Sequence, residues 1–381
     1  MSSDVLREKP KSLKIALVAG EKSGDELGGP LIKALKKDLP NIELIGVGGP
    51  AMIEQGLVSF FELEKISVMG IIEPLVKFPE LLSLRKNLKK FFLREKPDIF
   101  IGIDSPDFNL PIARYLKEKL ELKTAQYVSP SVWAWRKGRI KLIERSIDKL
   151  FTLFPFEKEA YRHSSVEVIY VGHPLAERFN PLPSKHTLRK KYGIGEKQTV
   201  VALLPGSRKS EVKAMGKIFV EAANMIRVSN DSIRFFLPLV SREHRELISD
   251  SSSLDWIEFS YGNSQEILSI ADFGILTSGT ASLESVLLRT PCVVAYKTHW
   301  LTYRVIKPLL TIPYISLPNL LTNKDLIPEL LQNEVTPQNI FQAFVDLQKK
   351  NRMNRVSSGG GFAGRKSNWQ TAFLLKAAEG R

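Results

Sequence analysis

The chain of 381 residues contains a single cysteine, Cys292, which excludes a disulfide framework and a cysteine-based zinc site. No uninterrupted apolar stretch approaches the ~18 residues that a membrane-spanning helix requires. The leader MSSDVLREKPKS is polar and charged, so we expect no signal peptide. These absences predict a protein of the reducing cytoplasm, whose membrane contact can only be peripheral.

Motifs for common nucleotide and metal chemistry are missing as well. The turn after the first predicted strand, GEKSGDELGG, lacks the GxGxxG pattern of dinucleotide-binding proteins. The sequence also holds no GxxxxGK(S/T) phosphate loop, no HExxH pair and no DxD-type acidic pair. A dehydrogenase, a kinase with a phosphate loop, a zincin and a metal-dependent sugar transferase therefore lack support. We expect neither a cofactor nor a bound metal.

Positive charge is in excess: 55 lysines and arginines stand against 41 acids, a formal net charge of +14. Such an excess indicates an anionic partner, such as nucleic acid, an anionic membrane surface or phosphorylated ligands. No basic surface interleaved with aromatic residues is apparent, and base stacking needs one, so we expect no nucleic acid.

Short apolar runs alternate with helix-period segments along most of the chain. The runs predicted as buried strands end at Ala19, Gly48, Asp104, Ser129, Phe154 and Gly172, and a second series consists of TVVALLPG, IRFFLPL, WIEFSY, DFGILTSG and PCVVAY. Strands alternating with helices indicate parallel sheets with crossover helices. The two series predict an α/β protein of two Rossmann-like domains, with a ligand-binding cleft between the carboxyl ends of their sheets.

The polar, proline-containing stretch 174–198 is the predicted linker between the two series. We therefore place a first domain at residues 1–175 and a second at 176–340. The remaining segment, 341–381, is expected to return to the first domain.

The stretch LLPGSRKSE lies where a predicted strand gives way to a helix. Gly206 permits a tight turn, Ser207 begins a run of backbone N–H groups at the helix N-terminus, and Arg208 adds a fixed positive fork. This combination predicts a diphosphate site. The alternative is an ordinary turn with a solvated arginine.

A second turn of this kind is TSGTASLE, where Ser278, Gly279 and Thr280 supply N–H and hydroxyl donors. Glu284 follows Thr280 by one helical turn, where a carboxylate could accept both hydroxyls of a ribose. The alternative is a helix cap followed by an exposed glutamate. Together the two turns predict a nucleotide diphosphate as ligand.

In the first series, GIDSPDFN places Asp104 at the carboxyl end of a buried strand, where a carboxylate can act as a general base. Asp107 is a second candidate, although helix capping suits it better. The glycine-rich turn GEKSGDELGG offers Glu21, Ser23 and Asp25 at the same edge of the sheet.

Residues 66–96 are rich in both apolar and basic side chains. The residues assigned to membrane or acyl-chain contact are Ile72, Leu75, Val76, Phe78, Leu81, Lys86, Lys89 and Lys90. Apolar residues beside a basic face are typical of an interfacial helix that binds anionic membranes. The alternative is a core-facing helix with a solvated basic side.

Three single residues allow two interpretations each. Trp133 in SPSVWAWR shapes an acceptor pocket or packs in the core. His173 in VGHPL is a hinge residue or a cleft ligand. Cys292 lies in an apolar run, where a buried small hydrophobe is favoured over a nucleophile.

Taken together, several stretches resemble the lipid-A-disaccharide synthase family of GT-B glycosyltransferases: IALVAGEKSGDELGG, ISVMGIIE, PDIFIGIDSPDFN, YVSPSVWAWR, LFPFEKE, VGHPL, LLPGSR, TSGTASLE and YISLPNLL. The resemblance implies that the 6-hydroxyl of 2,3-diacylglucosamine 1-phosphate attacks the anomeric carbon of UDP-2,3-diacylglucosamine. The products would be a β-1,6-linked disaccharide 1-phosphate and UDP. Another GT-B protein handling a UDP-sugar, such as an epimerase, is disfavoured by GIDSPDFN and SPSVWAWR.

The resemblance also implies roles. The first domain faces the acceptor and an anionic membrane surface at the inner-membrane face, with Asp104 as the base and Glu21 by the acceptor. The second binds the UDP-sugar through Gly206, Ser207, Arg208, Ser278, Gly279, Thr280 and Glu284, and Asn319 lies near the diphosphate or at the domain interface. A homodimer is compatible with the family. The chain departs from it at Pro30, which is expected to interrupt or delay the first helix.

Overall fold

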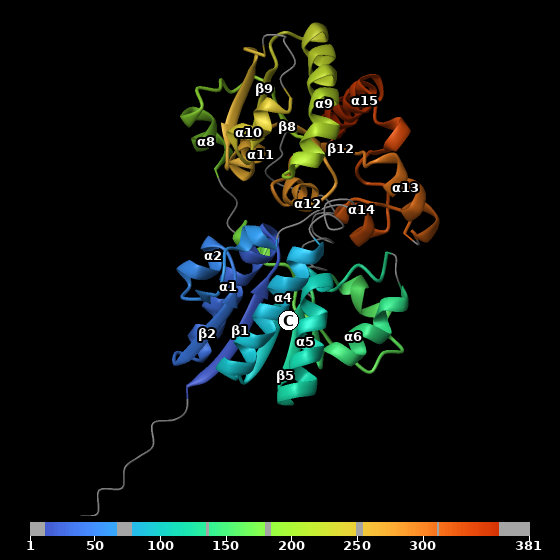
Figure 1. Ribbon diagram of the computed structural model, residues 1–381. Helices are drawn as coiled ribbons and strands as arrows, with labels where there is room; N and C mark the ends of the chain where they lie inside the picture. The colour runs from blue at the N-terminus through green and yellow to red at the C-terminus, as the bar shows by residue number, and fades with distance from the viewer. Residues whose placement is uncertain are drawn as a thin grey trace, which may run out of the picture. The chain divides into compact units, whose positions relative to one another are not determined.

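The computed structural model of the chain describes residues 12–66, 78–134, 137–179, 184–248, 254–310 and 312–357. The chain divides into two compact units, of which the first ends at Pro174 and the second begins at Leu175. Figure 1 colours the first from blue to green and the second from green to red. Within the described ranges, none of the helices has the length and apolar character needed to cross a membrane.

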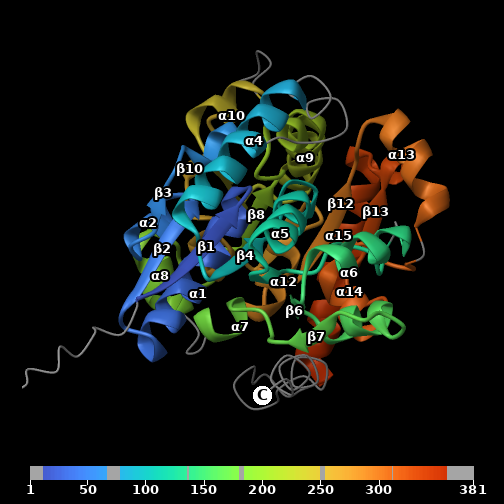
Figure 2. The same cartoon turned by 60° about the horizontal axis from the view of Figure 1, so that its bottom comes forward.

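The first unit holds a seven-stranded parallel sheet in the order β3-β2-β1-β4-β5-β6-β7. Its strands are β1 (Leu13–Ala19), β2 (Ile42–Val47), β3 (Val58–Ser59), β4 (Ile99–Ile103), β5 (Lys123–Tyr127), β6 (Lys149–Thr152) and β7 (Glu167–Tyr170). The strands are mostly apolar because helices cover both faces of a parallel sheet. The strand order reverses between β1 and β4, which lie side by side (Figure 2), and open α/β sheets bind ligands at such a switch point.

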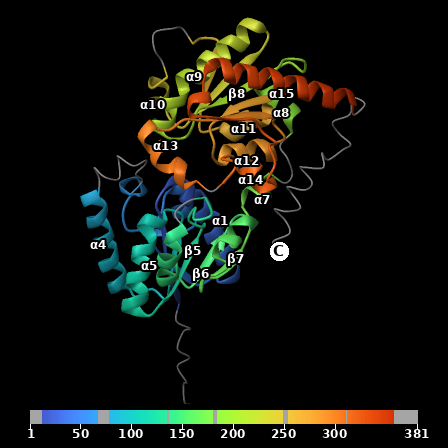
Figure 3. The ribbon, with the colours of Figure 1, turned by 90° about the vertical axis from the view of Figure 1, so that its right-hand side faces the viewer.

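The helices of the first unit are α1 (Lys22–Asp38), α2 (Pro50–Glu54), α4 (Phe78–Glu95), α5 (Pro106–Leu120) and α6 (Ile140–Ser146), with 3₁₀ turns η1 (Leu63–Lys65), η2 (Lys137–Arg139) and η3 (Pro155–Tyr161). Right-handed crossovers on the two sides of the switch point place α1 and α2 on one face of the sheet and α4, α5 and α6 on the other. Contacts between α1 and α2, and between α4 and α5, agree with this arrangement (Figure 3).

Helix α1 runs unbroken through Pro30, so the expectation that this proline interrupts or delays the helix is wrong. A proline removes one intrahelical hydrogen bond, whose acceptor would be the carbonyl of Glu26. Both residues are exposed, so water can replace the lost bond. On the buried side, Gly28 lets α1 approach α2 closely, because a Cβ there would lie 2.5 Å from Met52 Sδ.

The second unit holds a six-stranded parallel sheet in the order β10-β9-β8-β11-β12-β13. Its strands are β8 (Val200–Leu204), β9 (Arg234–Leu239), β10 (Ile257–Tyr261), β11 (Phe273–Leu276), β12 (Cys292–Tyr296) and β13 (Glu329–Leu331). The switch point lies between β8 and β11. Every apolar run predicted as a strand forms one, whereas β3 and β13, of two and three residues, were too short to produce a pattern.

The helices of the second unit are α7 (Leu175–Arg178), α8 (Lys185–Lys191), α9 (Lys209–Ser229), α10 (Arg242–Glu246), α11 (Ser264–Ile270), α12 (Thr280–Leu287), α13 (Trp300–Ile306), α14 (Leu317–Thr322) and α15 (Pro337–Ser357), with 3₁₀ turns η4 (Lys307–Leu309) and η5 (Gln332–Glu334). Helices α9 and α15 pack together on one face of the sheet, and α11 and α12 lie on the other (Figure 3).

Residues 184–198, which the sequence suggests as linker, belong to the second unit. Helix α8 is anchored by the buried guanidinium of Arg189, which donates to the carbonyl of Ile270 at 3.2 Å and to Asp272 Oδ2 at 3.1 Å. Lys185 Nζ reaches Asp272 Oδ1 at 2.9 Å. The stretch resembles a solvated linker because its acidic partner lies 83 residues away from Arg189 in sequence.

The described part of the C-terminal segment is helix α15. It packs against α9 and β12, with Ile340 and Phe344 in the core, so residues 341–357 belong to the second unit. The expected return to the first domain falls on residues 358–381, which lie outside the described residues.

Candidate active site

Asp104 follows β4 at the switch point of the first sheet. Its backbone φ is 52°, and that of Ser105 is 39°, so two consecutive residues adopt the left-handed conformation. Residues other than glycine rarely do so, and such strain persists only where the surrounding structure holds it. Ser23 Oγ donates to Asp104 Oδ2 at 3.1 Å, which brings the glycine-rich turn after β1 to this carboxylate.

The strained turn is held by two buried amides. Asn109 Nδ2 donates to the carbonyl of Asp104 at 2.9 Å and to that of Val18 at 3.0 Å. Gln126 Nε2 donates to the same carbonyl of Asp104 at 2.8 Å, and the Asp104 N–H donates to the carbonyl of Tyr127 at 2.9 Å. The backbone of Asp104 is therefore fixed by contacts from β5, α5 and the turn itself.

Asn109 was not predicted, although a signal was present. It lies on the apolar stripe of α5 that includes Ala113 and Leu116, and a polar residue in such a stripe is buried. Buried polar groups need partners, and those partners are the carbonyls at the ends of β1 and β4. Its Oδ1 has no hydrogen-bond partner among the described residues.

The turn after β1 approaches the turn after β4 closely. A Cβ at Gly20 would lie 2.3 Å from Ser105 Oγ, so only glycine fits there. Glu21 is the N-cap residue of α1, and its carbonyl accepts from the Asp25 N–H at 3.0 Å. Glu21 therefore lies at the predicted edge of the sheet, next to the turn that carries Asp104.

The other two acids of this edge have structural partners. Asp25 is buried and accepts hydrogen bonds from the N–H groups of Gly49, Ala51 and Met52, where it caps α2. Asp107 lies in the first turn of α5 and pairs with Arg139. Asp104 differs from both, because the side chain that contacts its carboxylate is the neutral hydroxyl of Ser23.

In the second unit, the turn after β8 carries the predicted diphosphate residues. Gly206 has φ 126°, which favours glycine, and α9 begins two residues after Ser207. The Ser207 and Arg208 N–H groups donate to Glu211 Oε2 at 3.1 and 3.4 Å, and Arg208 Nη1 lies 3.1 Å from Glu211 Oε1. In this structure the donors predicted for an anionic ligand are therefore engaged by a carboxylate of the same turn.

Glu211 itself was not predicted. A glutamate at the third position of a helix that reaches back to the N-cap N–H is a capping-box arrangement, so the local pattern carried the signal. Tyr296, at the end of β12, lies near this pair. Its pKa is raised, mainly by burial and further by Glu211, and Arg208 opposes the shift.

The turn after β11 lies beside the turn after β8, since Leu276 pairs with Leu204 in register. Ser278 Oγ donates to the carbonyl of Ile315 at 3.1 Å, Gly279 has φ 154°, and α12 begins at Thr280. The two turns that sequence places 70 or more residues apart thus meet at one switch point.

Glu284 is buried, so the alternative of an exposed glutamate after a helix cap is wrong. Its Oε1 accepts a hydrogen bond from Gln265 Nε2 at 2.7 Å, which orients the carboxylate. Gln265 lies on α11, and the sequence had no pattern that linked it to Glu284.

Asn319 is fully buried and its amide is used within the second unit. Nδ2 donates to the carbonyl of Ile327 and to Glu329 Oε1, both at 2.8 Å, and Oδ1 accepts from the N–H groups of Leu326 and Ile327 at 2.9 and 3.0 Å. Asn319 therefore joins α14 to the start of β13, and its expected place near the diphosphate or at the domain interface stays a prediction.

An aromatic cluster follows β5, β6 and β7 in the first unit. Trp133 lies edge-on to Phe156 at 4.9 Å between ring centroids, Phe156 stacks on Phe154 at 5.6 Å, and Phe154 contacts His173 at 5.7 Å. Trp133 and His173 are thus both packed side chains. Burial lowers the pKa of His173 to about 4, so its ring is neutral at neutral pH.

Glu157 is buried beside this cluster, where it accepts from the N–H groups of Leu153 and Phe154 at 2.8 and 2.9 Å. Burial raises its pKa to about 7, although the two N–H donors act in the opposite direction. Cys292 is fully buried, and burial raises the pKa of its thiol to about 12, so it behaves as the predicted small hydrophobe.

Helix α4 carries part of the predicted membrane segment. Leu81 and Leu88 are buried in the core of the first unit, so the assignment of Leu81 to membrane or acyl-chain contact is wrong. The core-facing alternative holds for this side of the helix. Ile72, Leu75 and Val76, together with the side chain of Phe78, lie outside the described residues.

The basic residues of α4 divide into two kinds. Lys86 and Lys90 are exposed. Lys89 Nζ instead lies 4.6 Å from the ring centre of Tyr115, and burial, followed by the charge of Arg85, lowers its pKa. Two of the three predicted lysines are therefore solvated cations.

Solved structures of other proteins share the architecture of this chain. The UDP-GlcNAc 2-epimerase of Neisseria meningitidis, bound to UDP-GlcNAc, is 13% identical with a TM-score of 0.64, covering 96% of this chain and 100% of that one. The glycotransferase of kitacinnamycin is 14% identical with a TM-score of 0.61, covering 97% and 96%. Together with the two switch-point sites, the fold is that of a GT-B glycosyltransferase.

The sequence comparisons narrow the class. The family model of lipid-A-disaccharide synthetase matches residues 15–360. The chain is 44% identical over 338 residues to a lipid-A-disaccharide synthase of Idiomarina loihiensis, covering 88% of this chain and 89% of that protein. It is 45% identical over 332 residues to one of Pseudomonas aeruginosa, covering 86% and 87%.

The chain therefore belongs to the lipid-A-disaccharide synthase family. It is a glycosyltransferase that joins UDP-2,3-diacylglucosamine and 2,3-diacylglucosamine 1-phosphate into the lipid A disaccharide 1-phosphate, with release of UDP. The predicted family, fold and activity are confirmed.

Proposed function

We propose that the second unit binds the UDP part of the donor through the two turns at its switch point. The N-terminus of α9 favours an anion, because its dipole and its N–H groups both point toward one. Arg208, with 40% of its side chain exposed, adds a guanidinium that suits a diphosphate. The observation that carries the proposal is the register of β8 and β11, which joins Gly206, Ser207 and Arg208 to Ser278, Gly279 and Thr280.

Glu211 determines how the diphosphate enters. Its carboxylate holds the N–H groups of Ser207 and Arg208, so a phosphate must share these donors or replace the carboxylate. Glu284, oriented by Gln265, is the proposed acceptor for the ribose hydroxyls. This division of roles places charge stabilisation of the leaving UDP with Arg208 and the two helix N-termini.

We propose Asp104 as the general base. Inversion at the anomeric carbon forms the new bond from the acceptor 6-hydroxyl while the bond to UDP breaks and UDP leaves with its electron pair. The hydroxyl proton passes to Asp104. Ser23 orients that carboxylate without cancelling its charge, whereas the Asp107 carboxylate is paired with Arg139 and is the weaker acceptor. Glu21 is the proposed neighbour of the acceptor sugar.

The test of the reaction uses the two acylated substrates with purified protein. We expect UDP release and a disaccharide 1-phosphate only when both substrates are present. UDP release at the same rate with the donor alone would mean that water attacks the donor, and it would contradict transfer to the acceptor.

We also propose that the first unit binds an anionic membrane surface through α4 and the segment before it. The exposed Lys86 and Lys90 support this, because each basic residue near an anionic surface contributes about 1 kcal/mol. The double variant Lys86→Gln/Lys90→Gln should co-sediment less with anionic vesicles at low salt. A matched control is Lys33→Gln/Lys37→Gln on α1, where both lysines are exposed too. Equal sedimentation of both pairs would refute this surface.

The proposed place of action is the cytoplasmic face of the inner membrane, since both substrates carry acyl chains and a sugar phosphate or nucleotide head.

A homodimer is the proposed alternative to a monomer. Analytical ultracentrifugation distinguishes the two states, and a mass equal to one chain at all concentrations would exclude the dimer.

A further inference from the structure

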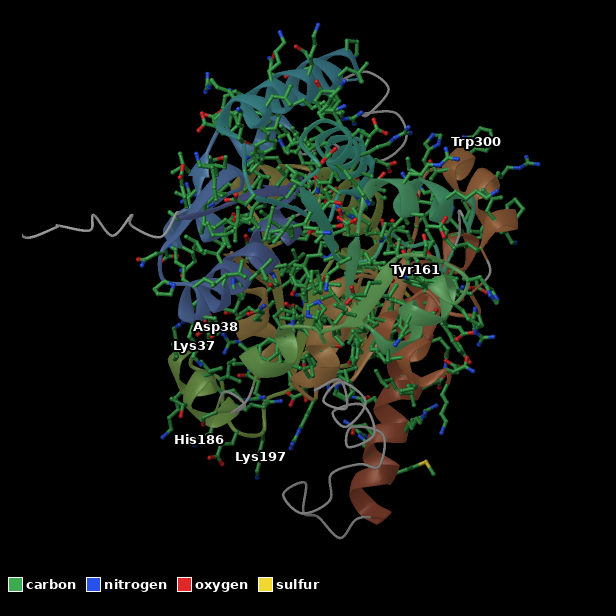
Figure 4. All side chains as sticks on the ribbon, turned by 90° about the horizontal axis from the view of Figure 1, so that it is seen from below. Lys37, Asp38, Tyr161, His186, Lys197 and Trp300 are labelled. Carbon is green, nitrogen blue, oxygen red and sulfur yellow. The ribbon has the colours of Figure 1, made fainter. Side chains whose placement is uncertain are left out.

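The segment after β12 exposes large side chains that no role described above uses. Trp300 begins α13 with 61% of its surface exposed, and Leu309 in η4 is 48% exposed. Figure 4 labels Trp300, which projects outward from the start of this helix, and Figure 2 shows α13 at the margin of the second unit. A tryptophan exposed to this degree loses the burial that usually stabilises it, so its position requires an explanation.

The charge around these side chains has one sign. No Asp or Glu occurs between Glu284 and Asp325. The basic residues of this interval are Arg289, Lys297, Arg304, Lys307 and Lys324. Arg304 and Lys307 are exposed, and Lys307 Nζ lies 5.4 Å from the ring centre of Tyr303. The exposed aromatic and aliphatic groups are therefore set among cations without neighbouring acids in sequence.

We propose that α13 and η4 form a second lipid-contacting surface, by which the second unit binds an anionic bilayer. Tryptophan is favoured at the membrane interface because its ring is apolar and its N–H remains hydrated. Arginine and lysine beside it interact with anionic headgroups, while an apolar residue such as Leu309 enters the acyl boundary. The inference rests on the proposed membrane association, but it concerns a different unit from α4.

The same observations disfavour a second copy of the chain as the partner. Two identical surfaces would bring Arg304 and Lys307 against their own counterparts, and like charges opposed across an interface cost several-fold in affinity or more. The segment also lacks acidic residues that could pair with them. An anionic lipid surface supplies the complementary charge and an apolar layer at once.

Tryptophan fluorescence tests the contact directly. Vesicles of phosphatidylcholine with added phosphatidylglycerol, containing a brominated lipid, should quench part of the emission of the wild-type protein. The Trp300→Phe variant should lose the part of this quenching that Trp300 contributes, because phenylalanine does not emit in the tryptophan band. Phenylalanine retains most of the apolar surface, so thermal melts of the two proteins should agree.

Charge provides a second measurement. Arg304→Gln/Lys307→Gln should weaken binding to the anionic vesicles by roughly 30-fold at low salt, and added salt should reduce this difference. The matched control is Lys190→Gln/Lys350→Gln, which removes the same charge from two exposed positions of α8 and α15 and should change binding little.

The outcomes separate this inference from the proposed role of α4. Vesicle binding with identical quenching in wild type and Trp300→Phe overturns the α13 surface and leaves the α4 surface standing. An equal loss of vesicle binding in Arg304→Gln/Lys307→Gln and in the control Lys190→Gln/Lys350→Gln also overturns the α13 surface. Net charge alone would then explain binding. Absence of any vesicle binding overturns both, and a lipid-independent dimer that Trp300→Phe dissolves would identify a second copy of the chain as the partner.

Discussion

The switch points of the two sheets differ in the groups that they present and in how those groups are held in place. At the first, the side chain of Asp104 is presented, and buried amides from Asn109 and Gln126 hold its backbone in a strained conformation. At the second, backbone N–H groups are presented, and the side chain of Glu211 holds them. If the proposed roles hold, the first unit fixes the main chain beside its reactive side chain, and the second uses a side chain to hold its main-chain donors.

Buried acids differ between the units as well. Glu157 in the first unit accepts hydrogen bonds from the uncharged N–H groups of Leu153 and Phe154, and burial raises its pKa. Asp272 in the second unit is paired with Lys185 and Arg189, which together with the Val200 N–H outweigh its burial and lower its pKa. Protonation of Glu157 should therefore favour the folded state, whereas protonation of Asp272 should disfavour it.

The largest expected effect is the loss of turnover when the carboxylate at the first switch point is removed. Asp104→Asn keeps the size of the side chain but cannot accept a proton, so turnover should fall on the order of 10²-fold or more. UDP binding, measured by calorimetry, should be nearly unchanged because the second unit is untouched. Asp107→Asn is the control. Near-normal turnover in Asp104→Asn would move the base to Asp107 or Glu21.

The second prediction concerns UDP affinity at the switch point of the second sheet. Arg208→Ala removes a charge-assisted contact worth roughly 1.5–3 kcal/mol, so UDP should bind about 10- to 150-fold more weakly. Turnover at saturating donor should fall less than turnover at low donor. Arg242→Ala, at an exposed position of α10, is the control. Equal affinity in both variants would place the diphosphate elsewhere.

The third prediction concerns the pH dependence of stability that Glu157 causes. Glu157 has a pKa of about 7 in the fold and near the ordinary 4.5 when unfolded. Between these values the unfolded chain has lost a proton that the folded chain keeps, so stability falls as pH rises from about 4.5 to 7. This decline amounts to up to roughly 3 kcal/mol in the free energy of unfolding. The variant Glu157→Gln should not show it. Denaturant unfolding at several pH values measures it, and parallel curves for both proteins would contradict the assignment.

The smallest predicted effect concerns the support of the strained turn. Asn109→Ala removes a side-chain donor from the carbonyl of Val18 and one of the two side-chain donors to the carbonyl of Asp104, at a cost of about 1–3 kcal/mol. The melting temperature should fall by several degrees. Asn87→Ala, at an exposed position of α4, is the control. A melting temperature equal to that of the control would show that the amide does not hold the turn.

Local patterns were enough to predict much of this protein. Apolar runs mark the strands, because strands of a parallel sheet are buried on both faces. Glycines and polar residues directly after those runs mark the turns at Gly206 and Gly279, and they place Asp104 at a strand end. Such features depend on neighbours within a few residues, which a sequence displays.

The sequence did not show which polar residues are buried, because burial depends on residues that are distant in the chain. The charged stretch around Arg189 resembles a linker until Asp272 is brought beside it. Nothing in the sequence indicates that the amide of Asn319 donates to the carbonyl of Ile327 and to Glu329. Lys89 resembles its exposed neighbours until the ring of Tyr115 covers it. The sequence by itself determined which residues form strands and turns, whereas only the tertiary structure decided which polar groups meet water and which must find partners inside.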